Sequence, residues 1–336
     1  MQGVTAADVA RIAGVAKSTV SLAFSAPDRV AVSTLQRILK TAEQHGYRPN
    51  PVAQSLKTGR NNSVGLLLQD LTNPHSGAVL QHVQTTAGRI GYMVMTATAA
   101  GDPKSDLRFV RHLERLKVPA AIINSSGSDA AYVNKLIESP MRFVTYGHKL
   151  SALECDHVGL DNHRTMQLLV RHLLDLGHRK IGHVAGDQTI SSAVERLVGV
   201  REHLAAAGLE LSDRHLAYGD YDENLAYSAA RSLLMRDDRP TALITANNVT
   251  AIGALRAVRD LNMSCPRDVS IATVDRLPWG DLFVPELTCA AQPIDEMANL
   301  AATWLIERLE NETKSSAPRL REFVPELIVG GSTSAV

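Results

Sequence analysis

The feature that most constrains the fold is a pair of short apolar blocks on either side of Gly14 and Val15. In each block the apolar residues recur at the spacing of one helix face. Thr5 and Asp8 have the spacing of a capping box, with Asp in the place of the usual Glu. Two helices of about seven residues joined by a tight turn that contains glycine form a helix-turn-helix. The two apolar stripes are Val9, Ala10 and Ala13, and Val20, Ala23 and Phe24.

The second helix begins at Lys17 or Ser18, and its apolar stripe faces the core. The outward face then carries Lys17, Ser18, Ser21 and Leu22. In a helix-turn-helix, this face of the second helix enters the major groove of DNA. A third helix is predicted over residues 33–45, with Gly46 just past its end. A pair of short helices in any small bundle is the alternative interpretation.

The distribution of charge favours the DNA-binding interpretation. Residues 1–62 contain eight Lys and Arg but three Asp and Glu, whereas the whole chain is balanced at 35 of each sign. The first 62 residues therefore carry a net charge of +5, and the remainder carries −5. A basic end on an acidic body is typical of a protein that presents that end to phosphates.

Two segments give the chain a specific resemblance. DVARIAGVAKSTVSLAF and RVAVSTLQRILKTAEQHGYRPNPVAQSLKTGR resemble, without gaps, the head and hinge of the LacI/GalR family of bacterial repressors. The body resembles the family as well, so the resemblance covers nearly the whole chain. It implies DNA contacts by a set of head and hinge residues, namely Thr5, Lys17, Ser18, Thr19, Ser21, Leu22, Arg29, Tyr47, Asn50, Val52, Ala53, Leu56 and Lys57.

The hinge is predicted to contain a very short helix. Asn50 is a good cap, Pro51 suits the first helical position, and Gly59 suits the exit. Residues 52–57 are far fewer than the ~12–15 that an isolated helix needs in water, so we expect coil in the absence of DNA. The resemblance implies that Leu56 inserts between base pairs from the minor groove, although a leucine can equally cap a core.

From Ser63 onward, short continuous apolar runs alternate with helical patterns, which predicts an α/β body with parallel sheets covered on both faces. Eight strands are better divided between two sheets, with the divide near residues 161–162. The resemblance implies a periplasmic-binding-protein-like fold, with a helix over residues 294–310 that returns to the first subdomain. Strands are predicted at 63–69, 92–97, 119–124, 142–146, 180–185, 215–218, 242–246 and 269–273, and helices near 76–90, 105–116, 129–138, 162–176, 193–207, 224–236 and 248–261.

Composition limits the cellular setting. The 336 residues are 45% hydrophobic and contain no run of 18 apolar residues, which argues against a membrane span. Met1 is followed almost directly by the first helix, so we expect no signal peptide. The three cysteines are far apart and lack the paired spacing of a zinc site, so they are read as reduced cytoplasmic thiols. We expect no metal and no cofactor.

In open α/β sheets, ligands bind at the carboxyl ends of the strands. Carboxylate, guanidinium, amide and aromatic groups that meet there suit a sugar or a similar polyol. The predicted ligand-binding residues, which also match the pocket of the family, are Asp70, Asn73, His75, Tyr146, Asp161, Arg196, Tyr221, Asn247, Asp275 and Gln292.

Two positions depart from the family pattern. The family often has Asn-Asp where this chain has Asn247-Asn248, and Asp-Asp where it has Asp275-Arg276. One acid is thus absent and one base is added. An acidic sugar or another anion therefore stands beside a neutral hexose as the expected ligand.

Catalysis is not expected, because the sequence has no G-x-G-x-x-G, G-x-x-x-x-G-K-[ST], G-x-S-x-G or H-E-x-x-H motif.

The leading hypothesis is a cytoplasmic, ligand-responsive repressor that binds a near-palindromic operator as a homodimer. We expect a homodimer because the tail lacks a leucine heptad. The alternative is a solute-binding or sugar-sensing protein without DNA function. The predicted domains are a helix-turn-helix head (1–48), a hinge (49–62) and a ligand-binding and dimerisation body (63–336). The body divides into an N-subdomain (about 63–161 and 293–321) and a C-subdomain (about 162–292 and 322–336).

The hinge generates the first prediction. Leu56→Ala removes the apolar wedge, so specific operator affinity should fall by roughly 1–3 kcal/mol. Affinity for random DNA depends on contacts between Lys or Arg and phosphate, so it should barely change. Fluorescence anisotropy with operator and random duplexes measures both. Hinge amides that are already protected from hydrogen exchange without DNA would contradict the prediction.

Overall fold

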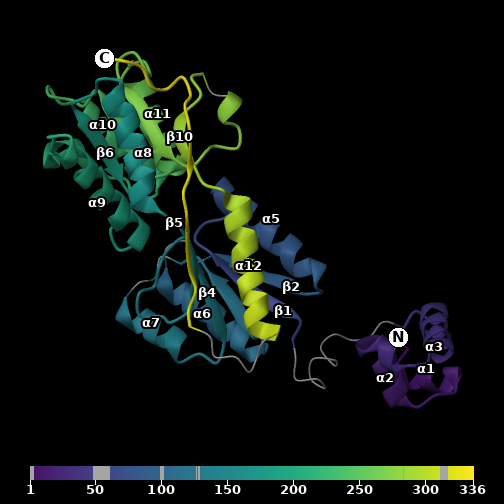
Figure 1. Cartoon of the computed structure of the whole chain (residues 1–336). Helices are drawn as coiled ribbons and strands as arrows, with labels where there is room; N and C mark the ends of the chain where they lie inside the picture. The colour runs from purple at the N-terminus through teal and green to yellow at the C-terminus, as the bar shows by residue number, and fades with distance from the viewer. Residues whose placement is uncertain are drawn as a thin grey trace. The chain divides into compact units, whose positions relative to one another are not determined.

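The computed structural model describes residues 4–47, 61–98, 102–125, 127, 129–282, 284–310 and 317–336. The chain separates into two compact units, Met1–Asn61 and Asn62–Val336 (Figure 1), and each is described by itself. The predicted hinge helix and its residues Asn50, Val52, Ala53, Leu56 and Lys57 lie outside the described residues.

The first unit is a small helical bundle. It contains α1 (Ala6–Ala13), α2 (Lys17–Ser25), the short 3-10 helix η1 (Pro27–Arg29) and α3 (Val32–Gln44). The predicted capping box is present, because Thr5 Oγ1 accepts a hydrogen bond from Asp8 N and the Asp8 carboxylate accepts one from Thr5 N. Gly14 ends α1 in the left-handed conformation, with φ of 64°, and thereby allows the tight turn into α2. The predicted helix-turn-helix is confirmed.

The bundle closes over a small apolar core. Val9, Val20 and Ile38, one from each helix, are completely buried. The ring of Phe24 is half-buried and meets the ring of Tyr47 edge-on, with 5.7 Å between the centroids. The two apolar stripes of the helix-turn-helix therefore face each other and α3, as their spacing predicts.

The second unit contains two six-stranded sheets, shown in the lower and upper halves of the body in Figure 1. All strand pairs are parallel except β10 with β12, which confirms the predicted α/β class. The first sheet has the spatial order β11 (Leu320–Phe323), β5 (Asp156–Leu160), β4 (Arg142–Tyr146), β3 (Ala120–Ile123), β1 (Ser63–Leu68), β2 (Met93–Thr98). The second has the order β12 (Glu326–Ile328), β10 (Thr288–Ala291), β9 (Ser270–Val274), β8 (Ala242–Thr245), β6 (Ile181–Ala185), β7 (Leu216–Tyr218).

Helices cover both sheets. Around the first sheet lie α5 (Pro74–Arg89), α6 (Pro103–Arg115), α7 (Ala130–Ile137) and α12 (Ile294–Glu310), and α12 packs along α5 (Figure 1). Around the second sheet lie α8 (Asn162–Asp175), α9 (Ser191–Ala206), α10 (Glu223–Leu234) and α11 (Asn248–Asp260), with the short 3-10 helices η2 (Asp213–His215) and η3 (Gly280–Leu282). The central strands β3, β5, β8 and β9 are buried along their whole length, as expected for parallel sheets with helices on both faces.

The chain passes between the sheets three times. It leaves the first sheet after β5, returns after β10 through α12, and crosses again between β11 and β12. Four strands, β5, β10, β11 and β12, were not predicted from the sequence. These segments contain charged residues or are only three to five residues long, so their local apolar signal is weak. The subdomain limits therefore stay predictions.

One buried carboxylate links the segments that pass between the two sheets. Asp156, the first residue of β5, has a fully buried side chain that pairs with Arg308 of α12 at 2.6 Å and with Arg319, just before β11, at 2.8 Å. The backbone N–H of Arg319 also donates to Asp156 Oδ1 at 2.8 Å. The guanidinium of Arg319 stacks on the ring of Trp304, 4.5 Å from its centroid. Three segments that are distant in sequence thus meet at one charge.

Asp156→Ala should lower the free energy of unfolding by about 3 kcal/mol, because it leaves two partly buried guanidinium groups without their carboxylate. Urea unfolding at pH 7 measures the loss. Asp213→Ala is the matched control, since Asp213 is 94% exposed and its pair with Arg201 is 3.6 Å long. Its substitution should change stability by less than about 0.5 kcal/mol. Equal effects of the two substitutions would contradict this role of Asp156.

The same group sets a pH dependence. Burial by itself raises the pKa of Asp156, but the hydrogen bonds from Arg308 and Arg319 outweigh it and hold the pKa below the ordinary value. A carboxyl with a lowered folded-state pKa stabilises the fold above its unfolded pKa and loses this contribution as the pH falls through its folded pKa. The stability difference between wild type and Asp156→Ala should therefore be complete at pH 7 and shrink below about pH 4.

Candidate functional site

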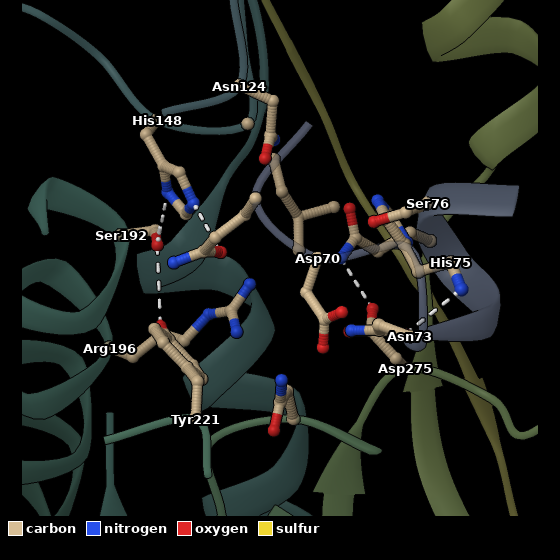
Figure 2. Close-up of a pocket in the computed structure, with 15 residues that line it drawn as sticks. Asp70, Asn73, His75, Ser76, Asn124, His148, Ser192, Arg196, Tyr221 and Asp275 are labelled. Atoms are coloured by element: carbon tan, nitrogen blue, oxygen red, sulfur yellow. Dashed lines mark hydrogen bonds between the residues drawn. The ribbon is translucent and has the colours of Figure 1, made fainter. Parts of the chain in front are cut away.

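A polar cavity of about 70 Å³ lies where the carboxyl ends of strands from both sheets meet. Figure 2 shows side chains that converge on it from the two halves of the body. Eight of the ten predicted ligand-binding residues line this cavity, namely Asp70, Asn73, His75, Arg196, Tyr221, Asn247, Asp275 and Gln292. Tyr146 and Asp161 do not line it, and Tyr146 lies beside the lining residue His75. The lining consists of Gln69, Asp70, Asn73, His75, Ser76, Asn124, Gly147, His148, Leu160, Ser192, Arg196, Tyr221, Asn247, Asp275 and Gln292.

Arg196 is the cation of the cavity. It lies on α9 and is 6% exposed. Its Nε donates to Asn162 Oδ1 at 2.8 Å, and its Nη1 donates to the carbonyl oxygen of Ala246 at 2.5 Å. Both partners are neutral, and no ion pair of Arg196 occurs among the described residues. A buried guanidinium held only by neutral oxygens can donate hydrogen bonds to a hydroxyl or carboxylate oxygen of a ligand.

Asp275 is a buried anion of the same cavity. It directly follows β9, is 6% exposed and has a φ of 70°. Its Oδ1 accepts a hydrogen bond from Gln292 Nε2 at 2.5 Å. Within the described part of the chain no cation pairs with it, so it can accept hydrogen bonds from the hydroxyl groups of a ligand.

His75 lines the cavity and packs beside Tyr146, which does not line it. Their ring centroids are 6.2 Å apart, and within the described residues His75 Nδ1 and the Tyr146 hydroxyl are buried without a hydrogen-bond partner. Burial lowers the pKa of His75 and raises that of Tyr146, so both side chains are neutral at pH 7. Buried polar atoms without partners are uncommon and are consistent with a ligand or water that completes them.

A second histidine, His148, also lines the cavity and was not predicted from the sequence. His148 follows β4, and its Nδ1 lies 2.9 Å from Ser192 Oγ. Ser192 Oγ in turn lies 3.4 Å from the Tyr221 hydroxyl, and Figure 2 draws this chain of contacts. Burial lowers the pKa of His148 to about 3. Asn124 and His148 could have been found by following every strand to its end, because β3 and β4 stop just before them.

Some predicted residues have structural partners. Asp161 lies outside the cavity and caps α8 by accepting from Arg164 N at 2.8 Å. Asn247 lines the cavity and also caps α11, accepting from Thr250 N at 2.9 Å. Arg276 does not line the cavity, and its guanidinium lies 3.5 Å from Glu286. The base beside Asp275 is therefore no argument for an anionic ligand.

The predicted DNA-reading face lies on α2 of the head. Lys17 and Ser18 are exposed, whereas Thr19, Ser21 and Leu22 are half-buried. The remaining head residues have different positions: Thr5 forms the capping box, Arg29 is exposed at the end of η1, and Tyr47 packs against Phe24. The DNA contacts of these residues stay predictions.

Comparison with known proteins defines the class. Residues 5–50 match the family described as bacterial regulatory proteins, lacI family, and residues 170–333 match a periplasmic binding protein-like domain. The HTH-type transcriptional regulator PtxS of Pseudomonas plecoglossicida is 32% identical over 336 residues, covering 98% of this chain and 96% of that protein. A helix-turn-helix head joined to such a body defines a DNA-binding transcriptional regulator.

Solved structures agree in fold. The Lac repressor dimer bound to operator and the anti-inducer ONPF has a TM-score of 0.88 at 22% identity, covering 99% of this chain and 100% of that one. The complex of the transcriptional regulator CelR with cellobiose has a TM-score of 0.74 at 26% identity, covering 98% and 99%. The chain belongs to the lacI family of bacterial regulatory proteins. None of the described helices is long and apolar enough to span a membrane.

Proposed function

We propose that this regulator is a cytoplasmic repressor that binds a near-palindromic operator as a homodimer and responds to a sugar or sugar acid. The head would occupy the major groove through α2, and the hinge would contact the minor groove. The observation that carries the effector assignment is the pair of buried, oppositely charged side chains Arg196 and Asp275, neither of which has an ion-pair partner among the described residues.

A polyhydroxylated ligand satisfies both groups. A hydroxyl can accept from Arg196 and donate to Asp275, whereas an apolar ligand would leave both charges desolvated. A sugar acid can place its carboxylate on Arg196 and its hydroxyls on Asp275. The cellobiose in the CelR complex is a neutral example among related structures. A thermal-shift screen that pairs neutral sugars with their acids, such as D-glucose with D-gluconate, separates the two kinds of effector.

Catalysis is not part of the proposal. The contact between Ser192 and His148 has the elements of a nucleophile and a base. However, burial holds the pKa of His148 at about 3, far below the value that a general base needs at neutral pH. The alternative of a solute-binding protein without DNA function does not account for the helix-turn-helix head.

The direct test is binding of the purified protein to DNA from its own upstream region, measured by gel shift. We expect a specific complex with a two-fold symmetric footprint, which weakens as salt rises. Equal affinity for upstream and random DNA at all salt concentrations would contradict the proposal.

Leu22 generates a prediction about sequence preference. Leucine can only contact a thymine methyl group, whereas arginine prefers guanine. Leu22→Arg should therefore change the preferred base at one symmetric pair of operator positions instead of weakening binding uniformly. Selection from a random DNA library should show the difference. An identical motif for both proteins would remove Leu22 from the base-reading face.

The cleft generates a prediction about effector response. Arg196→Ala and Asp275→Ala should each weaken effector binding by about 1.5–3 kcal/mol, because each removes a charge-assisted hydrogen bond. Operator binding should remain. Arg276→Ala is the control, because Arg276 is adjacent in sequence but lies outside the cavity. Calorimetry with the strongest compound from the screen measures all three, and unchanged affinity in both cavity variants would contradict the assignment.

A further inference from the structure

Among the described residues, three hydrogen bonds join the two halves of the body across the cleft. Asn248 Nδ2 donates to Asn73 Oδ1 at 3.0 Å, between the start of α11 and the start of α5. On a different side, the backbone N–H of Lys149 donates to Ser191 Oγ at 2.9 Å. Beside it lies the 2.9 Å contact of His148 with Ser192. The cleft is thus held by the protein's own groups.

The amide of Asn248 has a fixed orientation. Its Oδ1 accepts from Val249 N at 2.8 Å, so its Nδ2 faces Asn73. Asn73 Oδ1 is an acceptor in any case, because it caps α5 by accepting from His75 N at 3.0 Å. Asn248 is 1% exposed, so water does not readily replace this bond. The crossing therefore requires a hydrogen-bond donor at position 248.

The closed cleft has little room. Its cavity of about 70 Å³ is well below the ~300–1,000 Å³ that is typical of ligand pockets. A monosaccharide must therefore displace lining side chains or separate the two halves. Asn73 both lines the cavity and receives the bond from Asn248, so access of a ligand and this bond are coupled.

We propose that Asn248 is a positioning residue that acts through Asn73 to hold the cleft closed, and that the effector must break this contact to bind. The inference rests on the proposed function only in taking this cleft as the effector site. An aspartate at position 248 would place a carboxylate against Asn73 Oδ1 and could not donate to it. This contact therefore depends on the Asn247-Asn248 sequence of this chain.

Asn248→Asp tests the proposal in the full-length, ligand-free protein. Asp keeps the size of the side chain, can still accept from Val249 N, and is favourable at a helix N-terminus. Opening of the cleft exposes the new carboxylate to water, so global stability in urea should stay close to that of wild type. Hydrogen exchange of the Lys149 amide reports closure at the other crossing, and loss of one hydrogen bond should accelerate it about tenfold.

Asn224→Asp is the matched control. It makes the same chemical change near the start of α10, where the side chain is exposed and contacts Arg256 instead of the cleft. Exchange of the Lys149 amide should remain at the wild-type rate in this variant. Unchanged exchange in Asn248→Asp, or equal acceleration in both variants, would overturn the proposal. Neither result depends on operator binding, so failure here is distinguishable from failure of the proposed function.

Discussion

The ion cluster around Asp156 is the constraint on which the architecture of the body depends. Neither half of the body is a continuous piece of chain, so each return of the chain must be fastened. Arg308 and Arg319 reach the carboxylate of Asp156 from α12 and from the segment before β11. A buried charge is tolerated only where it is paired and hydrogen-bonded, so this cluster fixes the register of the crossing segments.

Two other buried charges of the body, Arg196 and Asp275, are partnered differently. Asp156 has two cationic partners, whereas Arg196 and Asp275 have only neutral partners among the described residues. The first arrangement is complete without a ligand and serves the fold. The second lacks partners of opposite charge and serves recognition, because a ligand can supply the missing hydrogen-bonding groups. Burial alone therefore does not separate structural from functional charges, but the nature of their partners does.

The sequence predicted the regular parts of the fold because they depend on local periodicity. The strands at 63–69 and 242–246 are apolar runs that need no distant partner to be recognised. In contrast, β5 begins with Asp156 and continues with His157, and only the distant arginines make its burial possible. Similarly, the spacing at Asp161 could not distinguish a helix cap from a ligand contact, whereas His148 lacked any motif that would have marked it.

Helix caps connect ligand recognition to the position of the two halves. The N-termini of α5, α9 and α11 all reach the cavity, which is where strands of parallel sheets deliver the helices that follow them. Asn73 and Asn247 cap two of these helices and also line the cavity. A ligand that donates a hydrogen bond to Oδ1 of either side chain competes with the backbone N–H group from which that oxygen already accepts. Recognition at the cleft is therefore coupled to the orientation of whole helices, and through them to the packing of each half of the body.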